Sequence, residues 1–250
     1  MLALVGVAML LFIVTCSAVG VRLLWLAKNG GGRPALLCGN GFTLIAILGF
    51  PLGVVSGQGV APVGEVLLPV AAVSLLANML GISSFFVFTV TVFRPRALWA
   101  HTLAGAAIAC MAMACIANLA SLALAPRTAS SFVVTWGWSA TFNGMCILCF
   151  AWMSAEGFAE WWKSRRRLAL GLSDPVVSNR LLMWGVFGAS TTSLCGVLLV
   201  FQLLRLPTVT DPLAQVAQAG FGIVSSGAAT LAFFPPPAYL TKLRALTKRG

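Results

Sequence analysis

The stretch EVLLPVAAVSLLANMLGISSFFVFTVTVFRPR, residues 65–96, decides the fold of this chain. No charged residue lies between Glu65 and Arg94. The run is longer than the roughly 20 apolar residues that a helix needs to cross the hydrocarbon core of a bilayer. Two arginines around Pro95 then end it. The pattern predicts a transmembrane helix over residues 65–93, followed by a basic loop.

Long apolar runs of this kind recur along the whole chain. Of its 250 residues, 60% are hydrophobic and 8% are charged, whereas a soluble chain carries about a quarter charged residues. We therefore expect an all-α polytopic membrane protein, in which residues 1–250 form a single bundle of seven transmembrane helices. The predicted spans cover residues 2–26, 35–57, 65–93, 98–125, 132–153, 180–204 and 212–234.

Basic residues concentrate in alternate gaps between these runs. Most of the 16 Lys and Arg residues follow the first, third, fifth and last spans, and the intervening gaps hold only Arg127 and Arg205. Loops rich in Lys and Arg stay in the cytoplasm, so the pattern predicts an outer N-terminus and a cytoplasmic C-terminus. We expect a multi-pass protein of a bacterial inner membrane. Its net charge of +11 favours contact with membrane lipids rather than nucleic acid.

Several short motifs predict helix boundaries. Asp174-Pro175 and Asp211-Pro212 each combine an N-cap acceptor with a proline at the first helical position. The fifth span is expected to continue as a helix past Met153 into the cytoplasm. Pro51 predicts a kink in the second span.

The third and seventh spans end in a similar motif. Phe93-x-Pro95-x-Ala97 and Phe234-x-Pro236-x-Ala238 share one spacing. Spans one to three and five to seven would share an orientation, so a parallel three-one-three duplication is geometrically allowed. The alternative is that a proline after a phenylalanine at the membrane exit is simply a common way to end a helix, and both interpretations stay open.

The span centres carry no charged residue, and this disfavours a proton- or sodium-driven carboxylate mechanism, although backbone carbonyls could still coordinate ions. Ion-coupled pumps and proton relays need ionisable side chains inside the bilayer, but Glu65 and Glu156 lie at span ends. The last span has no Lys for a retinal Schiff base, and the single histidine, His101, cannot form a pair of haem ligands. We expect no cofactor. Since no nucleophile–base pair, phosphate loop or metalloprotease motif is found, we do not expect an enzyme.

Cysteine and methionine are frequent in the apolar runs. Cys146 and Cys149 form a Cys-x-x-Cys motif beside Met145 and Met153, and soft sulfur ligands of this kind select Cu(I). The same residues are ordinary fillers of apolar helices. We predict no metal site.

Three asparagines lie within consecutive spans: Asn78, Asn118 and Asn143. An amide in lipid must find a partner, so these side chains are predicted to face the bundle interior. They either join helices to one another or line a neutral, hydrogen-bonding cavity. We take them as candidate ligand-binding residues.

A second candidate surface lies on the cytoplasmic connection between the fifth and sixth spans. It carries a cluster of basic residues that would contact a cytoplasmic protein partner or the lipid surface. The cluster comprises Lys163, Arg165, Arg166, Arg167 and Arg180.

The same connection carries a resemblance to known proteins. Its motifs are Glu160-Trp161-Trp162-Lys163, then LGLSDPVVSNR over residues 170–180, and Trp184-Gly185, with RLLWLA at 22–27, VFRP at 92–95 and FFPP at 233–236 in support. With these motifs the chain resembles a group of uncharacterised bacterial seven-span membrane proteins. Their features are in turn similar to the membrane input regions of some sensor histidine kinases. The resemblance implies a fold but no activity and no site residues.

These patterns favour a non-enzymatic sensory or signal-relay protein. It would read a neutral or lipidic cue and pass it to a cytoplasmic partner through a shift of the fifth span against the sixth. The alternatives are a facilitative transporter of a small neutral solute and a structural subunit of a membrane complex. A transporter predicts that the three asparagines surround one cavity, a sensor predicts a closed interior, and a subunit predicts a wide outward stripe of small residues.

Overall fold

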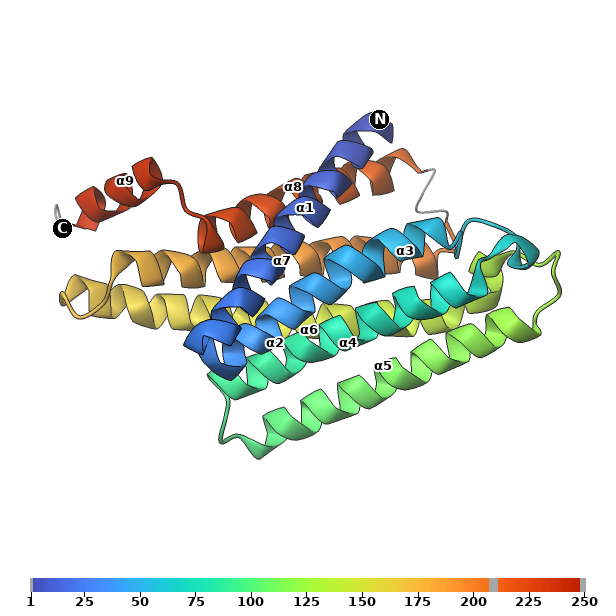
Figure 1. Ribbon diagram of the computed structural model, residues 1–250, viewed down its shortest axis with the longest axis horizontal. Helices are drawn as coiled ribbons and strands as arrows, with labels where there is room; N and C mark the ends of the chain where they lie inside the picture. Colours follow the sequence, from blue (N-terminus) through green and yellow to red (C-terminus); the bar gives the residue numbers. More distant parts are fainter. Residues whose placement is uncertain (1, 207–210, 248–250) are drawn as a thin grey trace.

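The computed structural model describes residues 2–206 and 211–247. Within these ranges the chain is helical without a strand, and Pro62 and Ser130 form an isolated β-bridge. Six helical stretches are long and apolar enough to cross a membrane, which confirms an all-α polytopic membrane protein. The helices are α1 (Leu2–Leu26), α2 (Gly32–Thr43), α3 (Phe50–Val55), α4 (Leu68–Phe93), α5 (Leu98–Leu124), α6 (Ser131–Ala169), α7 (Pro175–Leu203), α8 (Pro212–Phe233) and α9 (Pro237–Thr247) (Figure 1).

The first of these stretches, residues 5–55, folds back on itself. Its bend is η1 (Ala27–Gly31), where Asn29 and Gly30 leave the helical conformation. Gly30 has a φ of 98°, which glycine adopts without steric cost. The chain then returns, so that α2 packs against α1.

The kink predicted at Pro51 takes the form of a wide helical turn just before it. This turn is η2 (Leu44–Gly49), a π-helical segment between α2 and α3. Proline cannot donate to the helical ladder, and a π-bulge is one of the ways in which a helix absorbs such an interruption. At the end of the turn the carbonyl of Gly49 accepts a hydrogen bond from Ser74 Oγ on α4 at 2.6 Å. The irregular backbone is thereby joined to its neighbour.

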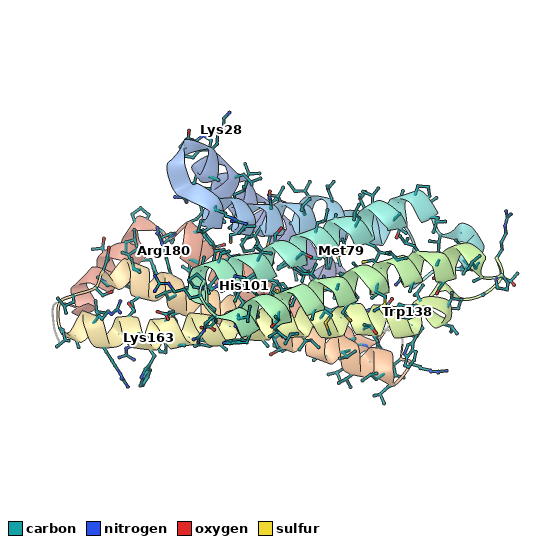
Figure 2. All side chains as sticks on the ribbon, turned by 90° about the horizontal axis from the view of Figure 1, so that it is seen from below. Lys28, Met79, His101, Trp138, Lys163 and Arg180 are labelled. Carbon is teal, nitrogen blue, oxygen red and sulfur yellow. The ribbon has the colours of Figure 1, made fainter. Side chains whose placement is uncertain are left out.

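The long helices form a closed ring with one helix outside it. Around the ring, α1 packs on the α2–α3 segment, this segment on α4, α4 on α6, α6 on α7, α7 on α8, and α8 on α1. Helix α5 packs on the outside against α4 and α6. Figure 2 places Lys28, Lys163 and Arg180 toward one end of the molecule and Trp138 toward the other. We refer to the end of Trp138, where residues 56–67 and 125–130 connect the helices, as the loop end.

Helix α6 is long enough to extend beyond a bilayer. Its 39 residues correspond to about 58 Å at about 1.5 Å per residue, roughly twice the thickness of the hydrocarbon core. The predicted continuation past Met153 is therefore confirmed. Asp174 and Asp211 cap α7 and α8 as predicted, because their carboxylates accept from the backbone N–H groups of Val176 and Leu213, both at 2.8 Å.

Helices α4 and α8 end in the same geometry. Arg94, after α4, has φ −135° and ψ 46°, and Phe234, after α8, has φ −128° and ψ 51°. The backbone geometry therefore places Phe93 of α4 at the position equivalent to Phe233 of α8. The sequence motif aligns Phe93 with Phe234, one residue later. The reason is that α8 ends at Phe233, before the run of prolines. The order of helices around the ring also fits two halves of three spans each, α1 to α4 and α6 to α8. The last helix of each half packs on the first helix of the other half, α4 on α6 and α8 on α1.

The backbones of α6 and α7 come very close to each other. A Cβ on Gly157 would lie 2.9 Å from the nitrogen of Gly185, and Ser154 Oγ donates to the carbonyl of Gly185 at 2.9 Å. Small residues permit this approach, which is the main source of helix association inside lipid.

Replacement of Gly157 by Ala is expected to lower the free energy of unfolding by about 1–3 kcal/mol, because the added methyl group meets backbone that cannot yield locally. Titration with SDS in mixed micelles measures this change. Gly144→Ala is the control, since Gly144 lies on the same helix with nothing within 4 Å of its added Cβ. Equal destabilisation by both variants would contradict the close-packing explanation.

Candidate ligand cavity

Two adjoining chambers, which we together call the cavity, lie between the helices of the ring. The loop-end chamber has a volume of about 510 Å³, and the central chamber has about 380 Å³. The two chambers share part of their lining: Val5, Met9, Phe50, Leu75, Asn78, Ser139, Gln202 and Gln218. None of the described residues that line them is charged. The cavity is therefore suited to an uncharged ligand.

The three predicted asparagines all line the central chamber. They come from three different helices: Asn78 from α4, Asn118 from α5 and Asn143 from α6. Asn78 also faces the loop-end chamber. The structure thus brings the three amides together around one space, and their role in ligand binding stays a prediction.

Asn118 has hydrogen-bond partners on both sides of its amide. Its Oδ1 accepts from Gln58 Nε2 at 2.7 Å, and its Nδ2 donates to Ser139 Oγ at 3.0 Å. The side chain is almost fully buried, at 2% exposure. It joins a loop, α5 and α6, and its hydrogen bonds are those of a residue that holds helices together.

Asn78 and Asn143 each use their nitrogen to bond a backbone carbonyl. Asn78 Nδ2 donates to Ser74 O at 3.0 Å, and Asn143 Nδ2 donates to Cys195 O at 3.1 Å and to Gln202 Oε1 at 3.4 Å. Asn78 packs tightly against η2, where a Cβ on Gly49 would lie only 2.4 Å from Asn78 Oδ1. The absence of a side chain at Gly49 makes room for this amide.

Four glutamines extend the amide lining toward the loop end. Gln202 and Gln218 line both chambers, while Gln58 and Gln215 line the loop-end chamber. The candidate site derived from the sequence omitted them. A signal existed for Gln202, Gln215 and Gln218, since amides within spans six and seven face the same constraint as the asparagines. Gln58 gave no such signal because it lies outside the helices.

A cluster of aromatic rings adjoins the central chamber on the side away from the loop end. Phe42 lies at the centre, with ring centroids 5.1 Å from Phe85, 5.4 Å from Phe187 and 6.1 Å from Trp184. Phe150 lines the central chamber and contacts Phe85 at 5.8 Å, so the cluster adjoins the cavity floor. We refer to this cluster as the aromatic plug. Its members are Phe42, Phe85, Phe88, Phe150, Trp184, Phe187 and Phe233.

The predicted basic surface lies away from the cavity. Lys163, Arg165, Arg166, Arg167 and Arg180 line neither chamber. Arg165 and Arg166 lie over the rings of Trp161 and Trp162, at 5.5 and 5.9 Å from the ring centroids. Such cation–π pairs hold aromatic and basic side chains together at a membrane interface.

Near this basic end, the buried carboxylate of Glu156 is paired with a guanidinium group and an indole N–H. Its Oε1 accepts from Arg94 Nε at 2.7 Å and from Trp152 Nε1 at 3.1 Å. The hydrogen bond and the charge of Glu156 raise the pKa of Arg94 above its ordinary value. This carboxylate therefore serves as an ion-pair partner between α6 and the loop after α4.

Comparison with family models, curated proteins and solved structures gave no match. The cavity and its side chains therefore carry the functional argument alone.

Gly49→Ala is expected to lower the free energy of unfolding by about 1–3 kcal/mol, because the new methyl group displaces the Asn78 amide. In an Asn78→Ala background most of this cost should disappear, since the clashing group is gone. SDS titration of the four proteins in this double-mutant cycle measures the coupling. Gly220→Ala, which meets nothing within 4 Å, is the control. Additive effects of the two substitutions would contradict the contact.

Proposed function

We propose that the chain is a facilitative transporter of a small uncharged solute. One observation carries the proposal: amide side chains from three helices meet around a single chamber in which none of the described lining residues is charged. If the amides served only to hold the helices together, they could form their hydrogen bonds at separate places in the bundle. A shared cavity lined by such groups is typical of a small-molecule site.

The absence of charge along the wall favours passive transport. Coupling to protons requires an ionisable side chain that changes its protonation during the cycle. The described lining residues offer amides and hydroxyls instead, which exchange hydrogen bonds with a neutral solute without any change of charge.

The shape of the cavity supports alternating access. Its loop-end chamber is lined by Gln58, Gly59 and Val60, and its central chamber adjoins the aromatic plug through Phe150. The two three-helix halves, α1 to α4 and α6 to α8, enclose it, and α5 connects them from outside the ring. Rocking of one half against the other would open the plug and close the loop end.

We further propose seven membrane spans, in which α1 and the α2–α3 segment are two separate crossings. The basic residues near Lys28, Lys163 and Arg180 then lie in the cytoplasm of a bacterial cell, as their common end in Figure 2 supports. The loop-end chamber would open to the outside. The resemblance to seven-span bacterial proteins agrees with this arrangement.

Flux into proteoliposomes tests the transport proposal. Uptake of neutral solutes such as glycerol and short alkanediols is expected to saturate with concentration and to be independent of a pH gradient or membrane potential. Ser139→Trp should abolish uptake, because Ser139 belongs to the walls of both chambers and an indole ring would fill their junction.

Ser193→Trp is the matched control, because Ser193 is exposed on the outside of α7. It should keep wild-type uptake. Saturable uptake that survives Ser139→Trp, or uptake driven by a pH gradient, would contradict passive transport through this cavity.

The proposed orientation has a separate test. Green fluorescent protein fused after the C-terminus should fluoresce in a bacterial host, whereas alkaline phosphatase fused there should be inactive, because this enzyme matures only outside the cytoplasm. The opposite pair of results would reverse the orientation. A loop fusion at Gly59 should behave in the opposite way to the C-terminal fusion.

A sensory or signal-relay role is the second candidate, and one feature favours it. The continuation of α6 and the start of α7 carry the basic surface, and α9 contacts α7 through Tyr239 Oη, which donates to Asn179 Oδ1 at 2.6 Å. Occupation of the cavity would shift α6 against α7 and move this surface. Ligand binding without flux would favour the relay.

A further inference from the structure

The orientation of two cavity amides is fixed by their backbone partners. A backbone carbonyl only accepts hydrogen bonds, so the group that faces Ser74 O must be the NH₂ of Asn78, and the group that faces Cys195 O must be the NH₂ of Asn143. The carbonyl oxygen of each side chain is thereby turned away from these partners. The assignment of nitrogen and oxygen in both amides follows from this geometry.

Both carbonyl oxygens are left as acceptors. Among the described residues no donor bonds Asn78 Oδ1 or Asn143 Oδ1, whereas Asn118 is bonded through both its oxygen and its nitrogen. Asn78 and Asn143 are only partly buried, and both belong to the wall of the central chamber. Burial of an acceptor without a hydrogen-bond donor costs about 1–3 kcal/mol of free energy. Donor groups on water or on another occupant of the chamber would satisfy these two oxygens.

Most of the other side chains in the chamber wall are apolar, and the remaining polar ones are Ser139, Thr191, Gln202 and Gln218. Side chains of Phe12, Ile45 and Phe142 contribute to it, and Phe150 adjoins the aromatic plug. The described lining residues of the chamber include no Lys or Arg to pair with an anion and no Asp or Glu to pair with a cation, so a charged ligand would lose its hydration without compensation. Its volume of about 380 Å³ lies within the range of small-molecule pockets.

We propose that the central chamber binds an uncharged amphipathic molecule whose O–H or N–H groups donate to Asn78 Oδ1 and Asn143 Oδ1 while its apolar body packs on the phenylalanines. The two asparagines determine specificity, and Asn118 holds the wall in place. This proposal rests on the proposed function insofar as both assign a ligand to the cavity, but it concerns the chemistry of binding and not flux.

Equilibrium dialysis of 1,2-octanediol against the protein in nanodiscs, with empty nanodiscs as the blank, tests the proposal. The matched compound is 1,2-dimethoxyoctane, which keeps the apolar body and both oxygens but has no donor. The diol should bind at least about fivefold more tightly than the ether, which corresponds to the loss of one neutral hydrogen bond or more. Equal affinities, or binding of neither compound, would overturn the proposal.

Two variants assign the selectivity to residues. Asn78→Leu and Asn143→Leu should each reduce the preference for the diol, and together they should remove it. Asn29→Leu is the matched control, because Asn29 Nδ2 also donates to the carbonyl four residues earlier, at 3.0 Å, but lies exposed at the η1 bend. If the folded double variant kept the same preference for the diol, neither asparagine could belong to the binding site. If a variant fails to fold, the comparison of diol and ether on the wild-type chain still decides the proposal.

The outcomes for binding and for transport are separable. Selective binding of the diol without any flux would overturn transport and leave the inference intact. Saturable flux together with equal binding of diol and ether would do the reverse.

Discussion

The rest of this structure depends on one constraint: inside lipid, every polar group must find its partner within the protein. The hydroxyls of Thr89 and Thr191 meet it by donating to the carbonyls four residues earlier, both at 2.9 Å. Amides cannot be satisfied so simply, because each has two donors and an acceptor. Asn78 bonds only a carbonyl of its own helix, whereas Asn118 and Asn143 bond groups on neighbouring helices. The cavity lies where these amides meet.

Glycines determine how closely the walls of this cavity approach. Gly157 and Gly185 bring α6 and α7 together at the backbone, whereas Gly49 leaves space for the Asn78 amide beside the η2 turn. Two kinds of contact result from the same residue type. One stabilises the ring through close packing, and the other keeps a polar side chain next to the chamber. Since lipid gives no hydrophobic driving force between helices, such local fits decide which helices pair.

The sequence made the general class of fold predictable because composition and charge act through the bilayer itself. The caps at Asp174 and Asp211 were also predictable, since each depends on only three consecutive residues. Other features depend on distant contacts. α4 begins at Leu68 and not at Glu65, because Val63–Glu65 forms a separate short turn whose backbone bonds to residues 127–129. The aromatic plug gave no signal, because phenylalanine in an apolar helix looks alike in the core and against lipid.

The same distinction holds for the candidate site. The convergence of Asn78, Asn118 and Asn143 follows from the cost of a lone amide in lipid, so a sequence argument reaches it. The hydrogen bonds that each asparagine makes could not be predicted from the sequence, because the partners come from other segments. Asn118 bonds Gln58 of a loop, and Asn143 bonds a backbone carbonyl of α7. Basic residues, in contrast, were placed by topology alone. Their contacts with Trp161 and Trp162 come from adjacent turns of a single helix.

Two arginines connect the halves of the ring at the end opposite the loops. Arg94 bridges α4 to Glu156 of α6, and Arg22 of α1 donates to the carbonyl of Phe233 on α8 at 2.5 Å with its guanidinium 4.6 Å from the ring centroid of Phe234. Both arginines reach water, since the Arg94 side chain is 44% exposed and Arg22 is exposed. The carboxylate of Glu156 is nevertheless buried, with 7% of its side chain exposed, so removal of Arg94 would leave a buried charge without its partner. The aromatic plug lies at the same end of the ring, and the rings of Phe42 and Trp184 are buried there. Separation of the two halves at this end would have to expose both this carboxylate and these rings.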